Sequence, residues 1–76
     1  MEEIKVGQIW QHYKGGQYKI IALAKYEDNL VDCVVYEAQH ENPTYKNWIR
    51  TKENFLEKIN YDGKEIQRFA LIKNPD

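Results

Sequence analysis

The fold is decided by a stretch that runs from residue 8 to residue 26 and reads QIWQHYKGGQYKIIALAKY. Two β-rich runs lie on either side of Gly15-Gly16, and a glycine pair adopts the positive φ angles of a tight hairpin turn without strain. In the second run, alternate residues from Tyr18 onward share one face, while Ile21 and Leu23 lie on the other. The pattern predicts a β-hairpin whose second strand is substantially buried on both faces.

The middle of the chain continues the extended pattern. After a polar break at residues 27–29, the β-branched and aromatic residues within positions 30–38 predict a third strand. Residues 39–47 are polar and include Pro43, which is typical of a loop, and the extended pattern resumes at Trp48-Ile49-Arg50.

The last third of the chain combines one helical turn with a hairpin. Thr51 suits the N-cap of a short helix within residues 51–58, and Asp62-Gly63 is a strong turn dipeptide before a last strand at residues 65–72. Residues 73–76 should fray. These elements predict an all-β protein, a small SH3-like five-stranded barrel with a short helical turn before the last strand. The alternative is an open, curled antiparallel sheet with one helix packed on it.

Length and charge limit the functional classes. A chain of 76 residues has room for a single domain, with its core at about residues 7–72. Its 11 basic and 12 acidic residues give a net charge of -1, so no global positive field collects nucleic acid. The single cysteine, Cys33, excludes an internal disulfide and a cysteine-rich zinc site. With no signal-peptide pattern and no spanning apolar run, we expect a cytoplasmic protein.

Several short motifs stand in order along the chain: His12-Tyr13-Lys14-Gly15, Tyr18, Val34-Val35-Tyr36, Trp48-Ile49-Arg50, Phe55, Asp62-Gly63 and Arg68-Phe69. Together they resemble a bacterial and phage family known as domain of unknown function 1653. The resemblance covers residues 7–72. Three positions depart from the family pattern, namely residues 25–28 in place of Arg-His-Ser-Glu, and Thr51 and Gln67 where proline is common.

Basic and aromatic residues interleave along the predicted strands. Cations beside aromatic faces hold anionic, planar ligands by charge-assisted hydrogen bonds and stacking. The predicted ligand-binding residues are His12, Lys14, Tyr36, Trp48, Arg50 and Arg68. We expect His12 and Lys14 to share one strand face, and Trp48 and Arg50 another.

A structural alternative accounts for the same residues. In it, Trp48, Tyr18 and Phe69 fill the core, while the basic side chains cover it or pair with Glu27, Asp32 or Glu37.

No pattern in the chain favours catalysis. It has no phosphate-binding loop, no dinucleotide fingerprint and no nucleophile motif, and we expect no catalytic residue, no metal and no cofactor. The sequence therefore predicts a non-enzymatic binding module for an anionic small molecule or nucleotide, such as a signalling nucleotide sequestered in a phage setting, and is compatible with a homo-oligomer.

Two other kinds of partner stay open. One is a protein partner, held by an SH3-like or Tudor-like groove in which Tyr13, Tyr36, Tyr45 and Trp48 are exposed together. The other, less favoured, is nucleic acid. No membrane role is expected.

Overall fold

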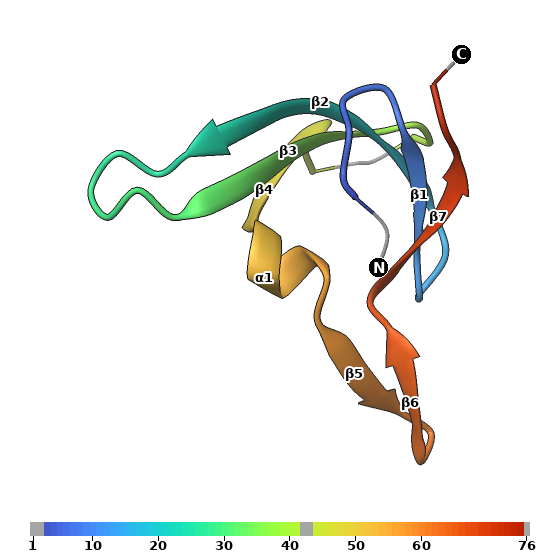
Figure 1. The fold of residues 1–76 in the computed structure, drawn as a ribbon. Helices are drawn as coiled ribbons and strands as arrows, with labels where there is room; N and C mark the ends of the chain where they lie inside the picture. The colour runs from blue at the N-terminus through green and yellow to red at the C-terminus, as the bar shows by residue number, and fades with distance from the viewer. Residues whose placement is uncertain (1–2, 42–43, 76) are drawn as a thin grey trace.

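A computed structural model describes residues 3–41 and 44–75. It shows a mostly β protein with antiparallel pairing and one short helix, as the sequence predicts (Figure 1). The elements are β1 (Ile9–His12), β2 (Gln17–Lys25), β3 (Asp32–Ala38), β4 (Asn47–Thr51), α1 (Lys52–Phe55), β5 (Lys58–Tyr61), β6 (Lys64–Gln67) and β7 (Phe69–Lys73). Five strands form one sheet in the order β4-β3-β2-β1-β7, and β5 pairs with β6 in a second sheet.

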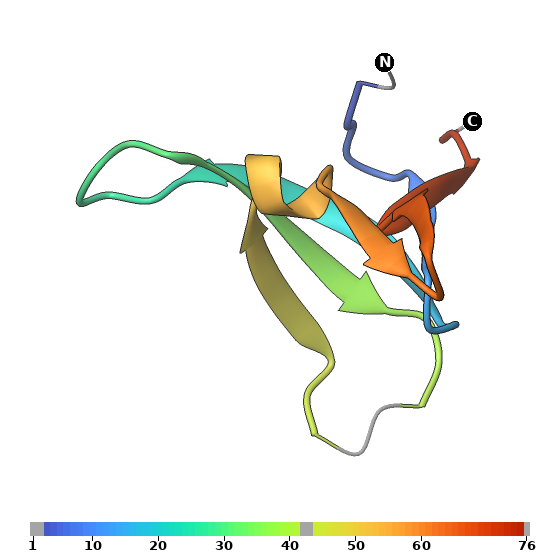
Figure 2. The ribbon, with the colours of Figure 1, turned by 90° about the horizontal axis from the view of Figure 1, so that it is seen from below.

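The larger sheet curls without closing. Strands β4 and β7 lie at its two edges, and no pairing between them is found among the described residues, so the five-stranded SH3-like barrel stays a prediction. Helix α1 packs against β3 and β4 and lies over one side of the sheet (Figure 2). Across residues 3–41 and 44–75, no helix is long and apolar enough to span a membrane.

Both predicted hairpins are present, but only the second has a two-residue turn, since residues 13–16 connect β1 to β2. Gly15 and Gly16 have φ angles of 96° and 83° in the connection between β1 and β2. Asp62 and Gly63, with φ angles of 54° and 79°, form the two-residue connection between β5 and β6. Positive φ at both central residues defines a type I′ turn, whose twist matches that of the flanking strands.

Burial of β2 on both faces is wrong. Ile20 is fully buried, whereas Ile21 is 37% and Leu23 51% exposed. The register shifts between Ile20 and Ala22, and the hairpin of β2 and β3 then projects beyond the rest of the molecule (Figure 1). Because Ile21 and Leu23 are exposed, the apolar composition of this strand overstated its burial.

The last predicted strand is divided in two. Strand β6 ends at Gln67 and β7 begins at Phe69, because the backbone of Arg68 serves two different partners. Its N–H donates to the Glu57 carbonyl (3.1 Å), and its carbonyl accepts from the Tyr13 N–H (2.9 Å). The short helix is confirmed, with Thr51 as its N-cap, whereas β3 begins at Asp32 rather than at residue 30 and Pro43 lies outside the described residues.

Aromatic rings dominate the core between the sheet and α1. Phe55 and Phe69 stack with ring centroids 4.1 Å apart, and Trp10 meets Phe55 edge-on at 5.3 Å. Trp10 is only 1% exposed, although the sequence analysis did not single it out and named Trp48 as the core tryptophan only in its structural alternative. The buried apolar cluster comprises Ile4, Trp10, Ile20, Val34, Tyr36, Phe55 and Phe69, with Tyr18, Trp48, Leu56 and Leu71 packed against it.

A buried glutamine ties the two ends of the chain together. The Gln8 side-chain oxygen accepts from the Lys5 N–H (2.8 Å) and from Trp10 Nε1 (3.0 Å). Its nitrogen donates to the Glu3 carbonyl (3.0 Å) and to Asn74 Oδ1 (2.9 Å). With four hydrogen bonds, a fully buried amide loses little on leaving water. Fraying is therefore wrong for residues 73–74, and Asp76 lies outside the described residues.

Candidate functional site

The predicted site residues of β1, β3 and β4 lie on the core-facing side of the large sheet. Tyr36 stands opposite both Ile20 of β2 and Trp48 of β4, and Val34 stands opposite Arg50. Directly opposed residues in an antiparallel pair point to the same face, so Trp48 and Arg50 share a face with the core, as predicted. Arginine rarely points toward a core. The position of Arg50 is therefore the first sign of a specialised site.

Arg50 joins three elements. Its Nε donates to the Tyr36 hydroxyl (3.1 Å), and its Nη1 donates to Asn54 Oδ1 on α1. Tyr36 itself is only 5% exposed, so its hydroxyl is the polar end of a core side chain. The guanidinium group thus covers the edge of the aromatic core at the junction of β3, β4 and α1.

Arg68 lies at the boundary between β6 and β7 and is well covered. Its side chain is 17% exposed, and Nη2 donates to Glu57 Oε1 at 2.8 Å. Arg68 Nε is buried with no hydrogen-bond partner among the described residues. A buried donor without an acceptor is energetically costly.

The ion pairs weighed in the sequence analysis are wrong for Arg68. Its partner is Glu57, whereas Asp32 pairs with Lys25 (2.7 Å) and Glu37 lies 4.0 Å from Lys46. The Asp32 carboxyl has a lowered pKa because Lys25 hydrogen-bonds to it and attracts it. The carboxylates of Asp32 and Glu37 thus pair with lysines and not with Arg68.

His12 lies at the end of β1 with its ring against aromatic neighbours. The ring centroid is 4.6 Å from that of Tyr13 and 4.9 Å from that of Phe69. The backbone N–H of Lys14 donates to Nδ1 (3.2 Å), a geometry that suits the neutral tautomer with its proton on Nε2. Burial lowers the pKa of His12, and the charges of Arg50, Arg68 and Lys14 lower it further.

The same two arginines also act on Tyr36. Burial raises the pKa of the Tyr36 hydroxyl, while the Arg50 hydrogen bond and charge oppose the rise, and Arg68 opposes it as well. The charges of Arg50 and Arg68 therefore act on both His12 and Tyr36, although the four residues come from distant parts of the sequence. We call His12, Tyr36, Arg50 and Arg68 the rim cluster.

Lys14 and Trp48 are less closely joined to this cluster. Strand β1 ends at His12, so Lys14 belongs to the turn and its expected strand alternation with His12 is wrong. Its Nζ lies 5.7 Å from the Tyr13 ring centroid. Trp48 is half-buried, and its Nε1 has no hydrogen-bond partner among the described residues. An open hollow of about 450 Å³ is lined by Tyr36, Trp48, Ile49, Arg50, Thr51 and Asn54.

Sequence reasoning missed two residues that position the arginines. Asn54 follows Arg50 by four positions and donates its own N–H to Thr51 Oγ1 (3.1 Å). Helical spacing does not indicate the contact of Arg50 with Asn54, because Arg50 belongs to β4 and only Asn54 belongs to α1. The contact of Glu57 with Arg68 also had no sequence signal, because the two residues are 11 positions apart.

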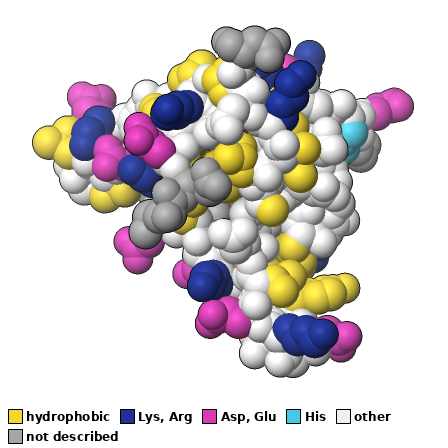
Figure 3. Space-filling model, turned by 45° about the vertical axis from the view of Figure 1, so that its right-hand side comes forward, with side chains coloured by type: hydrophobic (Ala, Val, Ile, Leu, Met, Phe, Trp, Pro, Cys, Tyr) yellow, Lys and Arg dark blue, Asp and Glu magenta, His cyan; other side chains and the backbone are white. Residues whose placement is uncertain are grey.

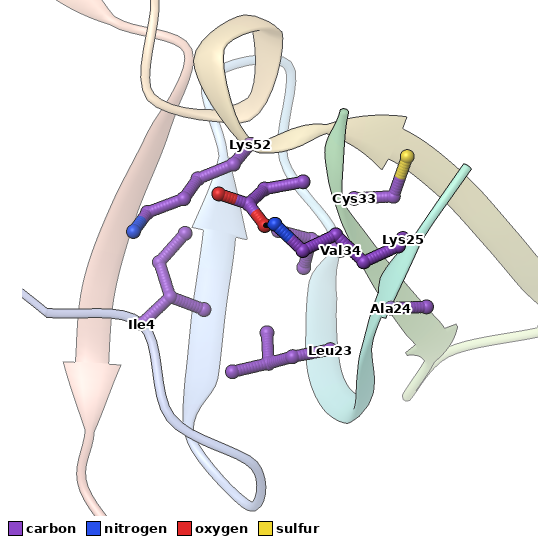
Figure 4. Close-up of a pocket in the computed structure, with 8 residues that line it drawn as sticks. Ile4, Leu23, Ala24, Lys25, Cys33, Val34 and Lys52 are labelled. Carbon is purple, nitrogen blue, oxygen red and sulfur yellow. Dashed lines mark ion pairs between the residues drawn. The ribbon is translucent and has the colours of Figure 1, made fainter. Parts of the chain in front are cut away.

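Another hollow, of about 310 Å³, lies on a different part of the molecule (Figure 4). Lys25 and Lys52 extend into it beside Ile4 and Leu23, and Asp32 pairs with Lys25 there. It contains none of the predicted site residues and no aromatic ring. The rim cluster therefore matches the predicted ligand chemistry better than this hollow does.

The surface carries mixed charge. On the face shown in Figure 3, basic and acidic side chains alternate, and apolar side chains come to the surface in the central hollow. Among residues 3–41 and 44–75, no group of three or more His, Cys, Asp or Glu side chains is placed to hold a metal ion. The rim cluster consists of nitrogen donors and one phenol, which suits an anion rather than a metal.

Comparisons with other proteins agree with the motifs along the chain. The family model described as "Protein of unknown function (DUF1653)" matches residues 8–71. A crystal structure of a DUF1653 protein from Bordetella bronchiseptica is similar with a TM-score of 0.81 and 23% identity, over 100% of this chain and 99% of that one. At this identity the likeness shows the fold. The search of curated proteins returned no match. Since the family model spans most of the chain, this protein belongs to the DUF1653 family.

Proposed function

We propose that the protein is a non-enzymatic binding module for an anionic small molecule, with a nucleotide as the preferred class. The observation that carries the proposal is the hydrogen bond from Arg50 to the Tyr36 hydroxyl at the edge of the aromatic core, together with the charges of Arg50 and Arg68, which both act on Tyr36 and on His12. Positive groups rarely cluster beside a core unless an anion or a carboxylate balances them. Glu57 balances Arg68 only in part, because Arg68 Nε has no partner among the described residues.

Each member of the cluster has a defined chemical task. Guanidinium groups donate two parallel hydrogen bonds to phosphate or carboxylate, which suits Arg50 and Arg68. Trp48 lines the open hollow beside Arg50, where a flat heterocycle has an aromatic edge and face to contact. Neutral His12 donates a hydrogen bond through Nε2, and gains a second attraction when an anion favours its protonation.

The curled sheet supports this assignment without a barrel. We infer an SH3-like arrangement in which the unpaired edges of β4 and β7 leave the aromatic core open to one side, with the rim cluster at the opening. The hollow is open and shallow, so the proposal assigns binding and no chemical step. A cytoplasmic location completes the proposal.

Calorimetry with a panel of mononucleotides, dinucleotides and inorganic phosphate tests the proposal. We expect at least one nucleotide to bind and to raise the melting temperature, since saturation at about 100 times Kd adds roughly 2.7 kcal/mol. Arg50→Gln and Arg68→Gln should each abolish that binding. Lys58→Gln is the matched control, because Lys58 is an exposed cation 3.8 Å from Glu65 on the β5–β6 hairpin. No binding by any member of the panel would overturn the nucleotide assignment.

A protein-binding groove is the second candidate. Tyr45 is 68% exposed and its ring centroid lies 6.3 Å from that of Trp48, so these two form an exposed aromatic pair. Tyr36, however, is buried, and Tyr13 instead contacts Tyr61 at 5.5 Å. The four aromatic residues expected to form one exposed groove are therefore not exposed as a set, which favours the small anion.

A further inference from the structure

Strand β4 is an edge strand, and its outer side pairs with no other strand within residues 3–41 and 44–75. It pairs with β3 in a register that places Val35 opposite Ile49, and the Ala38 N–H donates to the Lys46 carbonyl (2.8 Å) just before the strand. Hydrogen-bonded and non-hydrogen-bonded pairs alternate in an antiparallel ladder. Trp48 and Arg50 therefore direct their backbone groups toward β3. Asn47, Ile49 and Thr51 direct theirs toward the open edge.

The edge is accessible from both faces of the sheet. One open hollow, of about 450 Å³, is lined by Ile49, Arg50 and Thr51 on the core-facing side. A second, of about 370 Å³, includes the same three residues together with Tyr26 and Val31. The Ile49 residue is 59% exposed, and in Figure 2 β4 lies at the margin of the molecule. Space for a further strand thus exists along β4.

The other edge of the sheet is less suited to pairing. Strand β7 meets β1 with a register irregularity near Ile9, and it ends at Lys73. Irregularities and terminal lysines are devices by which proteins block unwanted strand addition. Strand β4 has a continuous register across its five residues and no proline, so it retains a regular edge.

We propose that β4 pairs antiparallel with β4 of a second copy of this chain, about a twofold axis at Ile49. In this register Asn47 stands opposite the partner's Thr51, Trp48 opposite the partner's Arg50, and Ile49 opposite the partner's Ile49. The arrangement makes Ile49 a hydrogen-bonded pair, which matches the outward direction of its backbone groups. The two edges then form one continuous sheet of ten strands, because each copy contributes five.

The side chains of β4 are complementary to themselves in this register. Trp48 and the partner's Arg50 form a non-hydrogen-bonded pair, in which side chains approach closest, and arginine over an indole face is a favourable cation–π contact. The two Ile49 side chains meet on the opposite face, and the polar Asn47 and Thr51 meet at the ends. A foreign strand offers no such match by symmetry, which favours a second copy as the occupant.

One contact at the ends opposes the dimer. Lys46, just before β4, would lie near the partner's Lys52, the first residue of α1, and like charges at close range repel. Glu37, at 4.0 Å, offsets the charge of Lys46 in part. Salt screens such repulsion, so the dimer should tighten as ionic strength rises.

The dimer would bring a residue of one copy into the binding site of the other. The hollow beside Trp48 would gain the partner's Arg50, so each anion site would contain one arginine from each chain at the shared edge. Pairing of the strands does not itself require a ligand. The dimer is therefore tested on the ligand-free protein, where failure of the dimer and failure of nucleotide binding are separate results.

Sedimentation equilibrium of the ligand-free chain, from about 1 µM to about 1 mM, is the first test, because a small interface predicts weak association. We expect twice the 9.1 kDa monomer mass at the upper end, and a larger dimer fraction in high salt. Ile49→Lys and Ile49→Pro should abolish the dimer, since the Ile49 N–H points away from β3. Ile72→Lys, an exposed isoleucine on β7, is the matched control. A monomer throughout, or equal loss with Ile72→Lys, overturns the proposal.

Crosslinking fixes the register. Ile49→Cys should yield a covalent dimer with a short bismaleimide, because paired Cα atoms lie about 5.5 Å apart. Thr51→Cys should not, since the two Thr51 positions are displaced by about 13 Å along the strands. The unmodified chain, whose only cysteine is buried Cys33, is the blank. Crosslinking of Thr51→Cys equal to that of Ile49→Cys would exclude the twofold pairing at Ile49.

Discussion

The core-facing side of the large sheet has two regions that differ in how their side chains are satisfied. At its centre, Phe55, Phe69 and Trp10 contact one another, and the indole nitrogen of Trp10 donates to buried Gln8. At its rim, Arg50 donates to the hydroxyl of Tyr36, a member of the same aromatic cluster, and Arg68 Nε is buried with no partner among the described residues. The indole N–H at the centre is hydrogen-bonded within the chain, whereas the rim has a buried N–H donor without a partner among the described residues.

The comparison teaches that burial alone does not separate scaffold from site in a domain of this size. Tyr36 belongs to both regions, because its ring packs 5.4 Å from Phe69 while its hydroxyl accepts from Arg50. What distinguishes the rim is unbalanced hydrogen-bonding capacity and positive charge. Substitutions at the centre should therefore change stability, and substitutions at the rim should change binding.

The largest effect is expected at the centre. Phe69→Ala should lower the free energy of unfolding by about 3 to 5 kcal/mol, because it removes a ring that stacks on Phe55 and leaves a cavity. Urea unfolding followed by tryptophan fluorescence measures the loss. Stability within 1 kcal/mol of the unmodified chain, an order-of-magnitude threshold, would show that this ring is not part of the core.

Trp48→Ala should have a smaller effect than Phe69→Ala. Trp48 is only half-buried, so truncation should cost about 1 to 2 kcal/mol rather than the full cost of a core ring. Trp10→Ala provides the comparison, since Trp10 is 1% exposed. Equal destabilisation by the two tryptophan substitutions in urea unfolding would remove the distinction between centre and rim.

A turn substitution tests the hairpin that adjoins Arg68. Gly63→Val should destabilise by about 1 to 2 kcal/mol, because Gly63 has φ of 79° and a β-branched residue is strained there. Gly63→Asn is the control, as asparagine tolerates this conformation better. Thermal unfolding of both variants measures the difference. Similar melting temperatures would mean that the turn is free to adopt another type.

The pH dependence of stability should report on the rim through His12. Its pKa is lowered in the folded protein, first by burial and then by Arg50, Arg68 and Lys14, so unfolding takes up a proton at mildly acidic pH. The stability that neutral His12 contributes to the folded protein is fully present above the unfolded-state pKa of about 6.5. It is lost as the pH falls through the lower pKa of His12 in the folded protein.

Thermal melts of the unmodified chain and of His12→Gln test this linkage. They should run from about pH 8 to about pH 5, roughly one to two units on either side of the unfolded-state pKa. His12→Gln should flatten the decline in melting temperature toward acid pH. A ligand anion should raise the pKa of His12, so nucleotide binding should strengthen as the pH falls. An identical slope in both proteins would exclude His12 as its source.

The smallest effect is expected at Lys14. Lys14→Gln should change the free energy of unfolding by less than about 0.5 kcal/mol, because this side chain belongs to an exposed turn. Titration calorimetry with the nucleotide that binds best should show a modest loss of affinity. Unchanged affinity would show that Lys14 is not part of the binding site. The positive charge of the site would then come from the rim cluster alone.

Local backbone chemistry explains what could be predicted. Gly15-Gly16 and Asp62-Gly63 adopt positive φ, and Thr51 accepts from the Asn54 N–H, because each of these preferences depends on neighbouring residues only. The shared face of Trp48 and Arg50 follows from the period of a strand for the same reason. The sequence by itself thus determined the turns, the helix cap and the antiparallel β class.

Only the tertiary structure decided how these pieces are shared between core and site. The choice of Trp10 over Trp48 as the buried tryptophan depends on Gln8, whose partners come from both ends of the chain. The division of the last strand at Arg68 depends on Glu57, just before β5, and on Tyr13, in the turn between β1 and β2, which bind its two backbone groups. The common effect of Arg50 and Arg68 on His12 and Tyr36 depends on the curl of the sheet, a collective property of strands distant in sequence that no local pattern encodes.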